Sequence, residues 1–191
     1  MNRLTPDSVL GILWLTWVAS WAVAAVWTTK TVARQSRASR LAHGVLVWAG
    51  GLFLFARPAR LGPLARPLFP PSPWTGWAGV ILCAAGLTFT WWARVYIGRF
   101  WSGTVTLKAD HVLIRNGPYS LTRHPIYTGL LLALTGTALE RDLLAGLIGL
   151  ALLLAGFVVK IRQEERLLLD HFGPAYAAYR AEVPALIPRI G

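Results

Sequence analysis

Long apolar segments alternate with short polar linkers along this chain. Five segments have the composition of membrane helices, namely residues 10–27, 41–56, 74–97, 125–139 and 143–159. The first carries no charge, and at ~1.5 Å per residue it is about long enough to cross a ~30 Å hydrocarbon core. The pattern predicts an all-α integral membrane protein with about five transmembrane helices.

The third segment has the most complete pattern of a membrane helix. Trp74 and Trp77 lie at its start, and Trp91, Trp92 and Tyr96 lie near its end. Aromatic side chains with a polar tip concentrate at membrane interfaces. We therefore expect this helix to meet both interfaces.

The last two segments form a predicted C-terminal helical hairpin. Residues 125–139 amount to roughly 22 Å of helix, which is short for a full crossing. Residues 140–142 make a polar turn, and residues 143–159 run back. The charged stretch 160–166 continues the second helix into water until Gly173 and the proline after it. A cytosolic, cofactor-binding tail is expected to follow.

That tail contains a predicted short helix, which begins at Pro174 and stops before Pro184. Tyr176, Tyr179 and Arg180 share one of its faces through their i, i+3 and i+4 spacing. Such a helix suits either an interfacial anchor or a cap over a site. Packing is the favoured role of the two tyrosines.

The composition fits a lipid environment better than a soluble domain. The chain is 55% hydrophobic and only 14% charged. A net charge of +11 would suggest nucleic acid in a soluble protein, but these arginines lie between apolar segments. We interpret them as topology signals and contacts to anionic lipid headgroups, without a nucleic-acid partner. The single cysteine, Cys83, excludes an internal disulfide bond.

The basic linkers predict the orientation. Lys30, Arg34, Arg37 and Arg40 follow the first segment, and short basic linkers stay in the cytoplasm. We expect a protein of the cell inner membrane, with its N-terminus outside and its C-terminus cytoplasmic. Three arginines in the proline-rich connector 57–73 argue in the other direction.

Small residues in the second segment predict a close helix contact. Gly44, Gly50 and Gly51 would let another helix approach, either from the same chain or from a second one. The oligomeric state is therefore left open.

The polar connector 98–122 has weaker patterns. Loose alternation of apolar residues from Val105 to Ile114 favours a short extended segment. Asp110 and His111 are adjacent, so they do not share a helix face, and no further ligand cluster is near them in sequence. We expect a solvated turn there and no metal site.

The most informative stretch, residues 115–129, joins this connector to the fourth apolar segment. Tyr119, Arg123, His124 and Tyr127 bring four polar tips to a membrane boundary. Charged groups near lipid are costly without partners or a cavity, so their presence indicates a functional site. The structural alternative is that Arg123 and His124 only contact lipid headgroups.

Several motifs combine around this stretch. Gly-Pro-Tyr stands at 117–119, Arg-His-Pro-x-Tyr-x-Gly at 123–129 and Glu-Glu at 164–165. The tail adds Phe-Gly-x-x-Tyr-x-x-Tyr at 172–179 and Val-Pro-x-x-Ile-Pro at 183–188. With this combination, about residues 95–191 resemble the isoprenylcysteine carboxyl methyltransferase family and its phospholipid methyltransferase relatives. We accordingly divide the chain into a three-helix membrane region, 1–97, and a catalytic region, 98–191.

The resemblance implies an enzyme that depends on S-adenosyl-L-methionine. It implies that Tyr119, His124, Pro125, Tyr127, Glu164 and Glu165 supply the cofactor site, without deciding which glutamate makes the contact. The catalytic residues that it implies are Arg123, Glu165 and Arg180, and the arginines would orient the acceptor. No Gly-x-Gly-x-x-Gly motif follows a strand, so a Rossmann-type methyltransferase is not supported.

The acceptor is expected to be lipophilic and to arrive from the bilayer. The resemblance places carboxyl O-methylation of an isoprenylcysteine first; such a carboxylate is already ionised, and a guanidinium can hold it bidentately. N-methylation of a phospholipid amine would need a proton acceptor such as Glu164 or Glu165. The sequence also leaves open a NADPH-dependent lipid or sterol reductase and a non-catalytic membrane scaffold.

Overall fold

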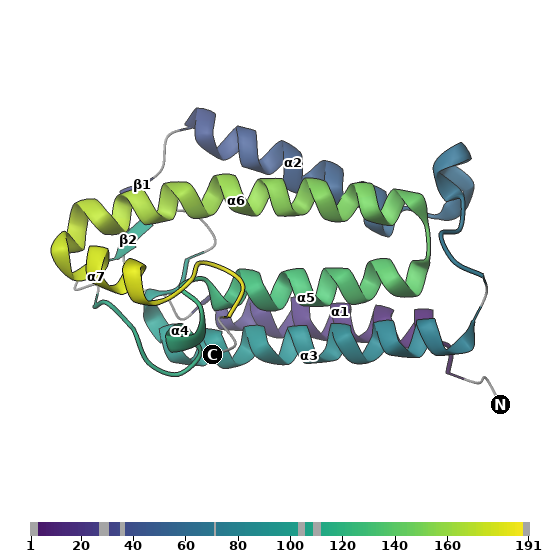
Figure 1. The fold of residues 1–191 in the computed structure, drawn as a ribbon, viewed down its shortest axis with the longest axis horizontal. Helices are drawn as coiled ribbons and strands as arrows, with labels where there is room; N and C mark the ends of the chain where they lie inside the picture. The colour runs from purple at the N-terminus through teal and green to yellow at the C-terminus, as the bar shows by residue number, and fades with distance from the viewer. Residues whose placement is uncertain are drawn as a thin grey trace.

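Five long helices run side by side in the computed structural model, which describes residues 4–26, 31–34, 37–70, 72–102, 106–108 and 112–188 (Figure 1). They are α1 (Pro6–Ala24), α2 (Arg37–Phe55), α3 (Pro73–Ile97), α5 (Pro125–Arg141) and α6 (Leu144–Phe172). The predicted helical membrane fold and its C-terminal hairpin are confirmed. Within the described ranges, Pro6–Ala24, Trp74–Phe100 and Leu144–Phe172 are long and apolar enough to span a membrane. Five crossings remain a prediction, since α2 and α5 fall short of this measure.

Shorter elements connect the long helices. They are η1 (Pro58–Arg60), η2 (Gly62–Ala65), η3 (Gly98–Phe100), α4 (Pro118–Leu121) and α7 (Pro174–Glu182). Strand β1 (Thr31–Arg34) pairs antiparallel with β2 (Thr106–Lys108), although β1 lies in a linker without a predicted strand. Asp110 and His111 lie outside the described residues, as do Lys30 and Val105.

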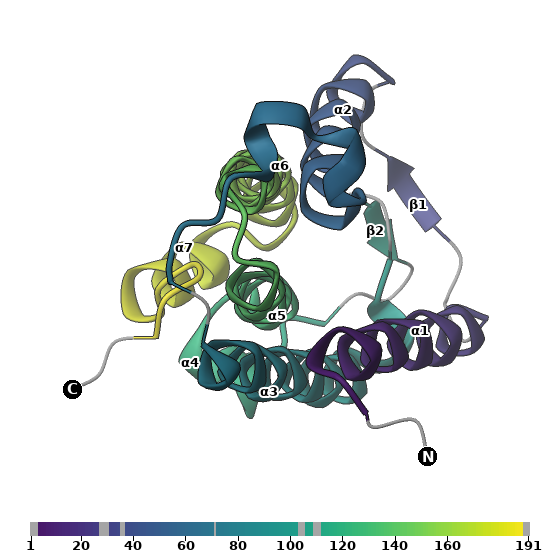
Figure 2. The same ribbon diagram turned by 90° about the vertical axis from the view of Figure 1, so that its right-hand side faces the viewer.

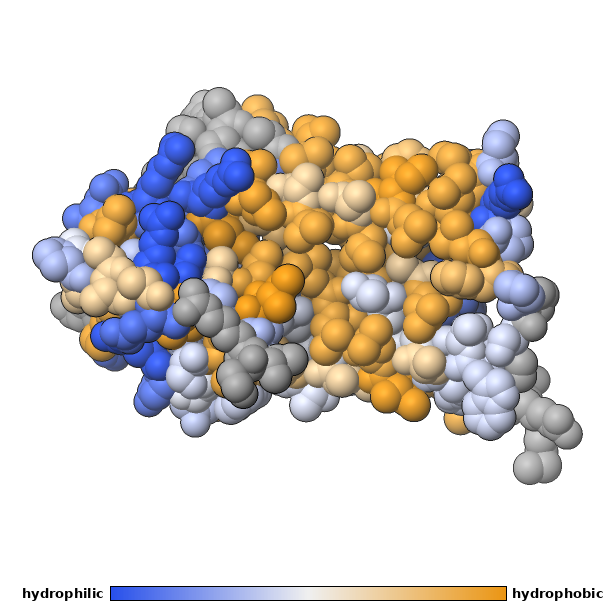
Figure 3. All heavy atoms as spheres, viewed as in Figure 1, coloured by the Kyte–Doolittle hydropathy of each residue, from blue (hydrophilic) through white to orange (hydrophobic). Residues whose placement is uncertain are grey.

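Viewed along the bundle, α5 lies between α3 and α6, with α1 beside α3 and α2 beside α6 (Figure 2). Hydrophobic residues cover the middle of the face drawn in Figure 3, and hydrophilic residues gather at its two ends. This distribution fits a bilayer that surrounds the middle of the bundle. α4, α7 and both strands lie at one end, and the turn between α5 and α6 lies at the other (Figure 1).

The hairpin turn is held by Asp142, which has a left-handed backbone with φ of 50°. Its Oδ1 accepts hydrogen bonds from the backbone N–H groups of Leu68 (3.2 Å) and Phe69 (3.0 Å). The N–H of Leu144 donates to the carbonyl of Arg66 at 3.0 Å. The proline-rich connector therefore supplies the partners that the ends of two helices lack.

Glycines bring the long helices into close contact. Gly86 of α3 faces Gly129 of α5, and a Cβ on Gly86 would lie 2.5 Å from the Gly129 carbonyl oxygen. Gly50 of α2 faces Gly149 of α6 in the same way, which confirms a contact within the chain. Gly44 and Gly51 have nothing within 4 Å of an added Cβ. Since lipid is as apolar as the side chains, such close packing is a main source of helix association in membranes.

Candidate functional site

Backbone geometry sets the corner that leads into α5. Gly117 has φ of +58°, and a Cβ there would overlap the Tyr96 ring, so the position requires glycine. His124 is the N-cap residue of α5, and Pro125 occupies the first helical position. Proline suits that position because its fixed φ is helical and its missing N–H would have no partner there.

The C-terminal segment 183–188, called the tail strap below, lies against this corner. Arg123 and His124 donate their backbone N–H groups to the carbonyls of Pro184 (2.9 Å) and Ala185 (3.1 Å). The Thr128 hydroxyl donates to the carbonyl of Leu186 at 2.7 Å. The tail strap thus fixes a corner about sixty positions earlier in the chain.

A buried ionic cluster joins the corner to α6. Glu165 Oε1 accepts from Arg123 Nε at 2.8 Å and lies 3.3 Å from His124 Nε2. Arg180 Nε lies 3.6 Å from the other oxygen, Oε2. Arg123 Nη1 also donates to the carbonyls of Val183 and Arg180. With Glu165 only 9% exposed, this carboxylate depends on its cationic partners.

Glu164 makes a second, separate set of contacts. Its Oε1 accepts from the Tyr127 hydroxyl at 2.7 Å, and its Oε2 lies 3.5 Å from His124 Nδ1. Tyr127 stacks between His124 and Phe157, with ring centroids 5.8 Å and 5.3 Å apart. The two adjacent glutamates therefore approach His124 from opposite ring nitrogens.

His124 carries a raised pKa in this setting. Burial lowers the pKa of its imidazole, but interactions with Glu164 and Glu165 raise it, and the net pKa lies above its ordinary value. In the protonated ring both nitrogens can donate, which matches a carboxylate at each side.

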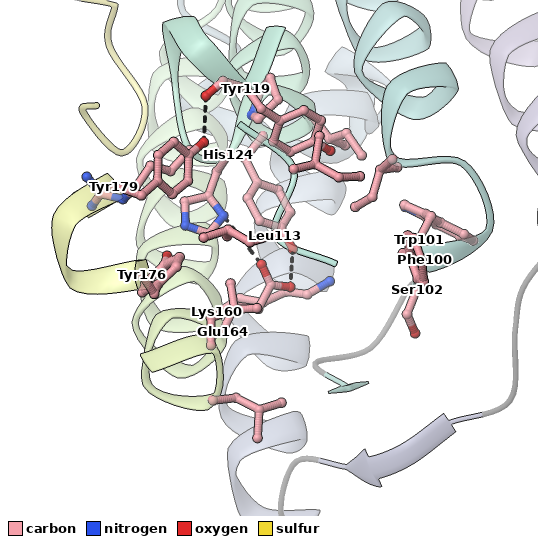
Figure 4. Close-up of a pocket in the computed structure, with 18 of the residues that line it drawn as sticks. Phe100, Trp101, Ser102, Leu113, Tyr119, His124, Lys160, Glu164, Tyr176 and Tyr179 are labelled. Atoms are coloured by element: carbon pink, nitrogen blue, oxygen red, sulfur yellow. Dashed lines mark hydrogen bonds and ion pairs between the residues drawn. The ribbon is translucent and has the colours of Figure 1, made fainter. Parts of the chain in front are cut away.

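A cavity of about 230 Å³ opens beside these groups (Figure 4). One wall is aromatic and consists of Trp17 and Trp21 from α1 with Phe100 and Trp101 from the connector. Polar side chains from the corner and α6 form another wall, and Tyr176 and Tyr179 of α7 lie beside His124 (Figure 4). The site therefore combines an apolar slot with converging polar groups, as small-molecule sites do.

Arg94 of α3 supports the aromatic wall from behind. Its Nη1 and Nη2 donate to the carbonyls of Gly98 and Ala24, both at 2.6 Å. Its guanidinium lies over the Trp101 ring, 5.0 Å from the centroid. Arg94 is 5% exposed, and it ties the end of α1 to the start of the connector.

Six of the eight site residues predicted from the sequence line the cavity: Tyr119, Arg123, His124, Pro125, Tyr127 and Glu164. Glu165 and Arg180 do not line the cavity; Glu165 contacts the lining residue Arg123, and Arg180 contacts Glu165. Sequence reasoning missed Trp17, Trp21 and Lys160 and favoured packing for Tyr176. The i, i+4 spacing of Trp17 and Trp21, whose rings stack at 4.6 Å, was the available signal for the first two.

Residues 79–170 match the isoprenylcysteine carboxyl methyltransferase family. The cobalt-zinc-cadmium resistance protein CzcN of Cupriavidus metallidurans is 36% identical over 130 residues, which are 66% of this chain and 59% of that protein. The protein-S-isoprenylcysteine O-methyltransferase of Schizosaccharomyces pombe is 36% identical over 51% of this chain and 43% of its own. The chain thus spans less than two thirds of the length of either relative.

A solved structure of a eukaryotic intramembrane Ras methyltransferase, an isoprenylcysteine carboxyl methyltransferase, has a similar fold. The superposition covers 100% of this chain and 70% of that one, with a TM-score of 0.59. At 21% sequence identity, the likeness concerns the fold alone.

Proposed function

This chain belongs to the isoprenylcysteine carboxyl methyltransferase family, and on that premise we propose that it transfers a methyl group from S-adenosylmethionine to a lipophilic acceptor. One observation carries the proposal: Glu164, His124 and Tyr127 converge with an aromatic wall on a single cavity, at the polar end of a membrane bundle.

The side chains around the cavity suit the separate groups of S-adenosylmethionine. Its ammonium group needs a carboxylate, and Glu164 is the only carboxylate among the described lining residues. Its adenine needs an apolar or aromatic slot, which Trp21 and Trp101 provide. We assign Glu164, His124, Tyr127, Tyr119 and Pro125 to cofactor binding.

When bound, the cofactor supplies an electrophilic methyl group on a positively charged sulfur. Trp17, Trp21 and Phe100 line the cavity with apolar surface, which disfavours water there. Exclusion of water favours a reaction between opposite charges, because both charges disappear as the methyl moves. The protonated His124 ring faces Glu164 with Nδ1 and Glu165 with Nε2, and so keeps Glu164 in place.

Within this assignment, Arg123, Glu165 and Arg180 organise the acceptor side. Nε and Nη2 of Arg123 both donate to Glu165, so its bidentate face is used within the protein. Arg180 is about half exposed beside Glu165, where its guanidinium can meet an incoming anion. Glu165, the one carboxylate of this cluster, is paired with both arginines, which favours an acceptor that is already ionised over an amine that needs a base.

The proposed acceptor is therefore the carboxyl group of an isoprenylcysteine that enters from the bilayer. The proposed orientation places the cavity on the cytoplasmic side of the inner membrane, because β1 and the start of α2, which belong to the basic linker, lie toward the same end of the bundle (Figure 1).

Calorimetry on the purified protein in detergent tests the cofactor, with reduced nicotinamide cofactor run in parallel. We expect saturable binding of S-adenosylmethionine alone, whereas binding of the nicotinamide alone would support a reductase. Transfer of labelled methyl then tests the acceptor, with farnesylated cysteine, its methyl ester and phosphatidylethanolamine as substrates. Label on the free carboxyl compound only is the expected result. Label on the phospholipid would move the assignment to N-methylation.

A further inference from the structure

Tyr176 carries a buried hydroxyl whose proton has no acceptor in the described part of the chain. The residue is 1% exposed and lines the cavity. A buried hydroxyl without a partner costs folding free energy, so buried polar atoms are nearly always paired. An orphan group of this kind in a cavity wall calls for a ligand.

The neighbouring tyrosine provides a contrast on the same helix. Tyr179 lies one turn further along α7, and its ring centroid is 6.0 Å from that of Tyr176. The Tyr179 hydroxyl donates to the carbonyl of Tyr119 at 2.5 Å (Figure 4). Both rings are buried and both line the cavity, but only Tyr179 is satisfied by the protein.

The surroundings of the orphan hydroxyl leave its proton for an acceptor atom of a ligand. Burial, and then the charge of Glu165, raise the pKa of Tyr176, so the phenol keeps its proton and can donate. Arg123 and Glu165 pair with each other and both act on this hydroxyl, and Arg123 can donate a hydrogen bond to its oxygen, so the phenol proton is the part that lacks a partner. A carboxylate oxygen of a ligand is a strong acceptor for such a proton. Glu164, the carboxylate for an ammonium group, contacts Tyr127 instead.

We propose that Tyr176 is a ligand-binding residue whose hydroxyl donates a hydrogen bond to a carboxylate of the molecule bound in the cavity. The inference rests on the proposed function, because S-adenosylmethionine and an isoprenylcysteine each carry one carboxylate. α7 then contributes to recognition as well as to packing.

The test compares Tyr176→Phe with Tyr179→Phe, which remove one hydroxyl each and leave the rings in place. Thermal unfolding without ligand is measured first. Tyr176→Phe should melt at or above the temperature of the unaltered protein, because it removes an unsatisfied group. Tyr179→Phe should melt lower, because the Tyr119 carbonyl loses its donor. A clear destabilisation by Tyr176→Phe would mean a structural partner and would overturn the proposal.

Calorimetry then identifies the carboxylate. If it belongs to the methyl donor, Tyr176→Phe lowers the affinity for S-adenosylmethionine about tenfold, as expected for a hydrogen bond to a charged group. The affinity for decarboxylated S-adenosylmethionine then stays the same. If it belongs to the acceptor, the affinity for S-adenosylmethionine stays the same and the affinity for farnesylated cysteine falls about tenfold. The affinity for the methyl ester of farnesylated cysteine then does not change. Tyr179→Phe should show neither carboxylate-dependent loss.

Two negative results are distinguishable. Undiminished binding of both molecules to Tyr176→Phe, with normal binding to the unaltered protein, overturns the role of Tyr176 alone. Failure of the unaltered protein to bind S-adenosylmethionine or farnesylated cysteine overturns the proposed function together with this inference.

Discussion

Arg123 and Glu165 form a buried ion pair in which Nε and Nη2 of the guanidinium donate to the same carboxylate oxygen, at 2.8 Å and 2.5 Å. The pair joins the corner before α5 to the C-terminal part of α6. The same guanidinium holds the carbonyls of Val183 and Arg180. The site, the hairpin and the tail strap therefore depend on one interaction.

Arg123→Ala should destabilise the protein by about 3 kcal/mol, because it leaves the Glu165 carboxylate buried without its main partner. The free energy of unfolding is measured in detergent by calorimetry. The matched variant replaces Arg123 and Glu165 together by Met and Leu. It should regain part of the stability, since no buried carboxylate is left unpaired although the carbonyls of Val183 and Arg180 lose their donor, and it should still fail in methyl transfer. A single Arg123→Ala variant with normal stability and turnover would refute the role of this pair.

Glu164→Gln and Glu165→Gln should differ although the residues are adjacent. Glu164→Gln should lower the affinity for S-adenosylmethionine by tenfold or more, because the cavity loses its carboxylate. Glu165→Gln should lower the melting temperature more than the affinity and should abolish methyl transfer. Calorimetry and thermal unfolding on both variants decide this. The reverse order of effects would assign the cofactor contact to Glu165.

The charge of His124 should make stability depend on pH. The pKa of His124 is raised in the folded protein. Its contribution to folding stability is therefore fully present below the ordinary histidine pKa of 6.5 and is lost as the pH rises through the pKa of the folded state. The melting temperature should therefore fall on going from about pH 6 to about pH 9, and His124→Gln should flatten this part of the curve. Parallel curves for both proteins would show that another group titrates.

Gly50 and Gly51 offer a matched pair on α2. A Cβ on Gly50 would lie 2.7 Å from the Gly149 carbonyl oxygen and from Leu153 Cγ, whereas one on Gly51 would meet nothing within 4 Å. Gly50→Ala should cost about 1–3 kcal/mol through overpacking, while Gly51→Ala should be neutral or slightly stabilising. Denaturant unfolding in detergent measures both. Equal effects would place the α2 contact elsewhere.

Removal of the tail strap should loosen the corner. A chain that ends at Val183 loses the carbonyls of Pro184, Ala185 and Leu186, which accept from Arg123, His124 and Thr128. Hydrogen exchange at residues 122–128 should accelerate, and S-adenosylmethionine should bind more weakly. A chain that ends at Pro188 keeps these bonds and serves as the control. Unchanged exchange in the shorter chain would contradict the role of the strap.

The local features of this molecule were readable from its sequence. The helices follow from long apolar runs, the hairpin turn from residues 140–142, and the corner from Gly117 and Pro125, because each depends on neighbouring residues. Part of the candidate site was also readable, because Tyr119, Arg123, His124 and Tyr127 occupy one short stretch of the sequence.

Contacts between distant segments depended on the tertiary structure. β1 is four residues long and exists through its pairing with β2, more than seventy positions away. Trp17 belongs to the cavity because α1 packs on α3, where its indole N–H donates to Thr90 at 2.7 Å. Glu164 and Glu165 have the same chemistry and adjacent positions, and the packing of α6 against the corner directs one to the cavity and the other to Arg123. Only the packed state also distinguishes Tyr176 from Tyr179, because hydrogen-bond satisfaction depends on which atoms the fold brings within reach.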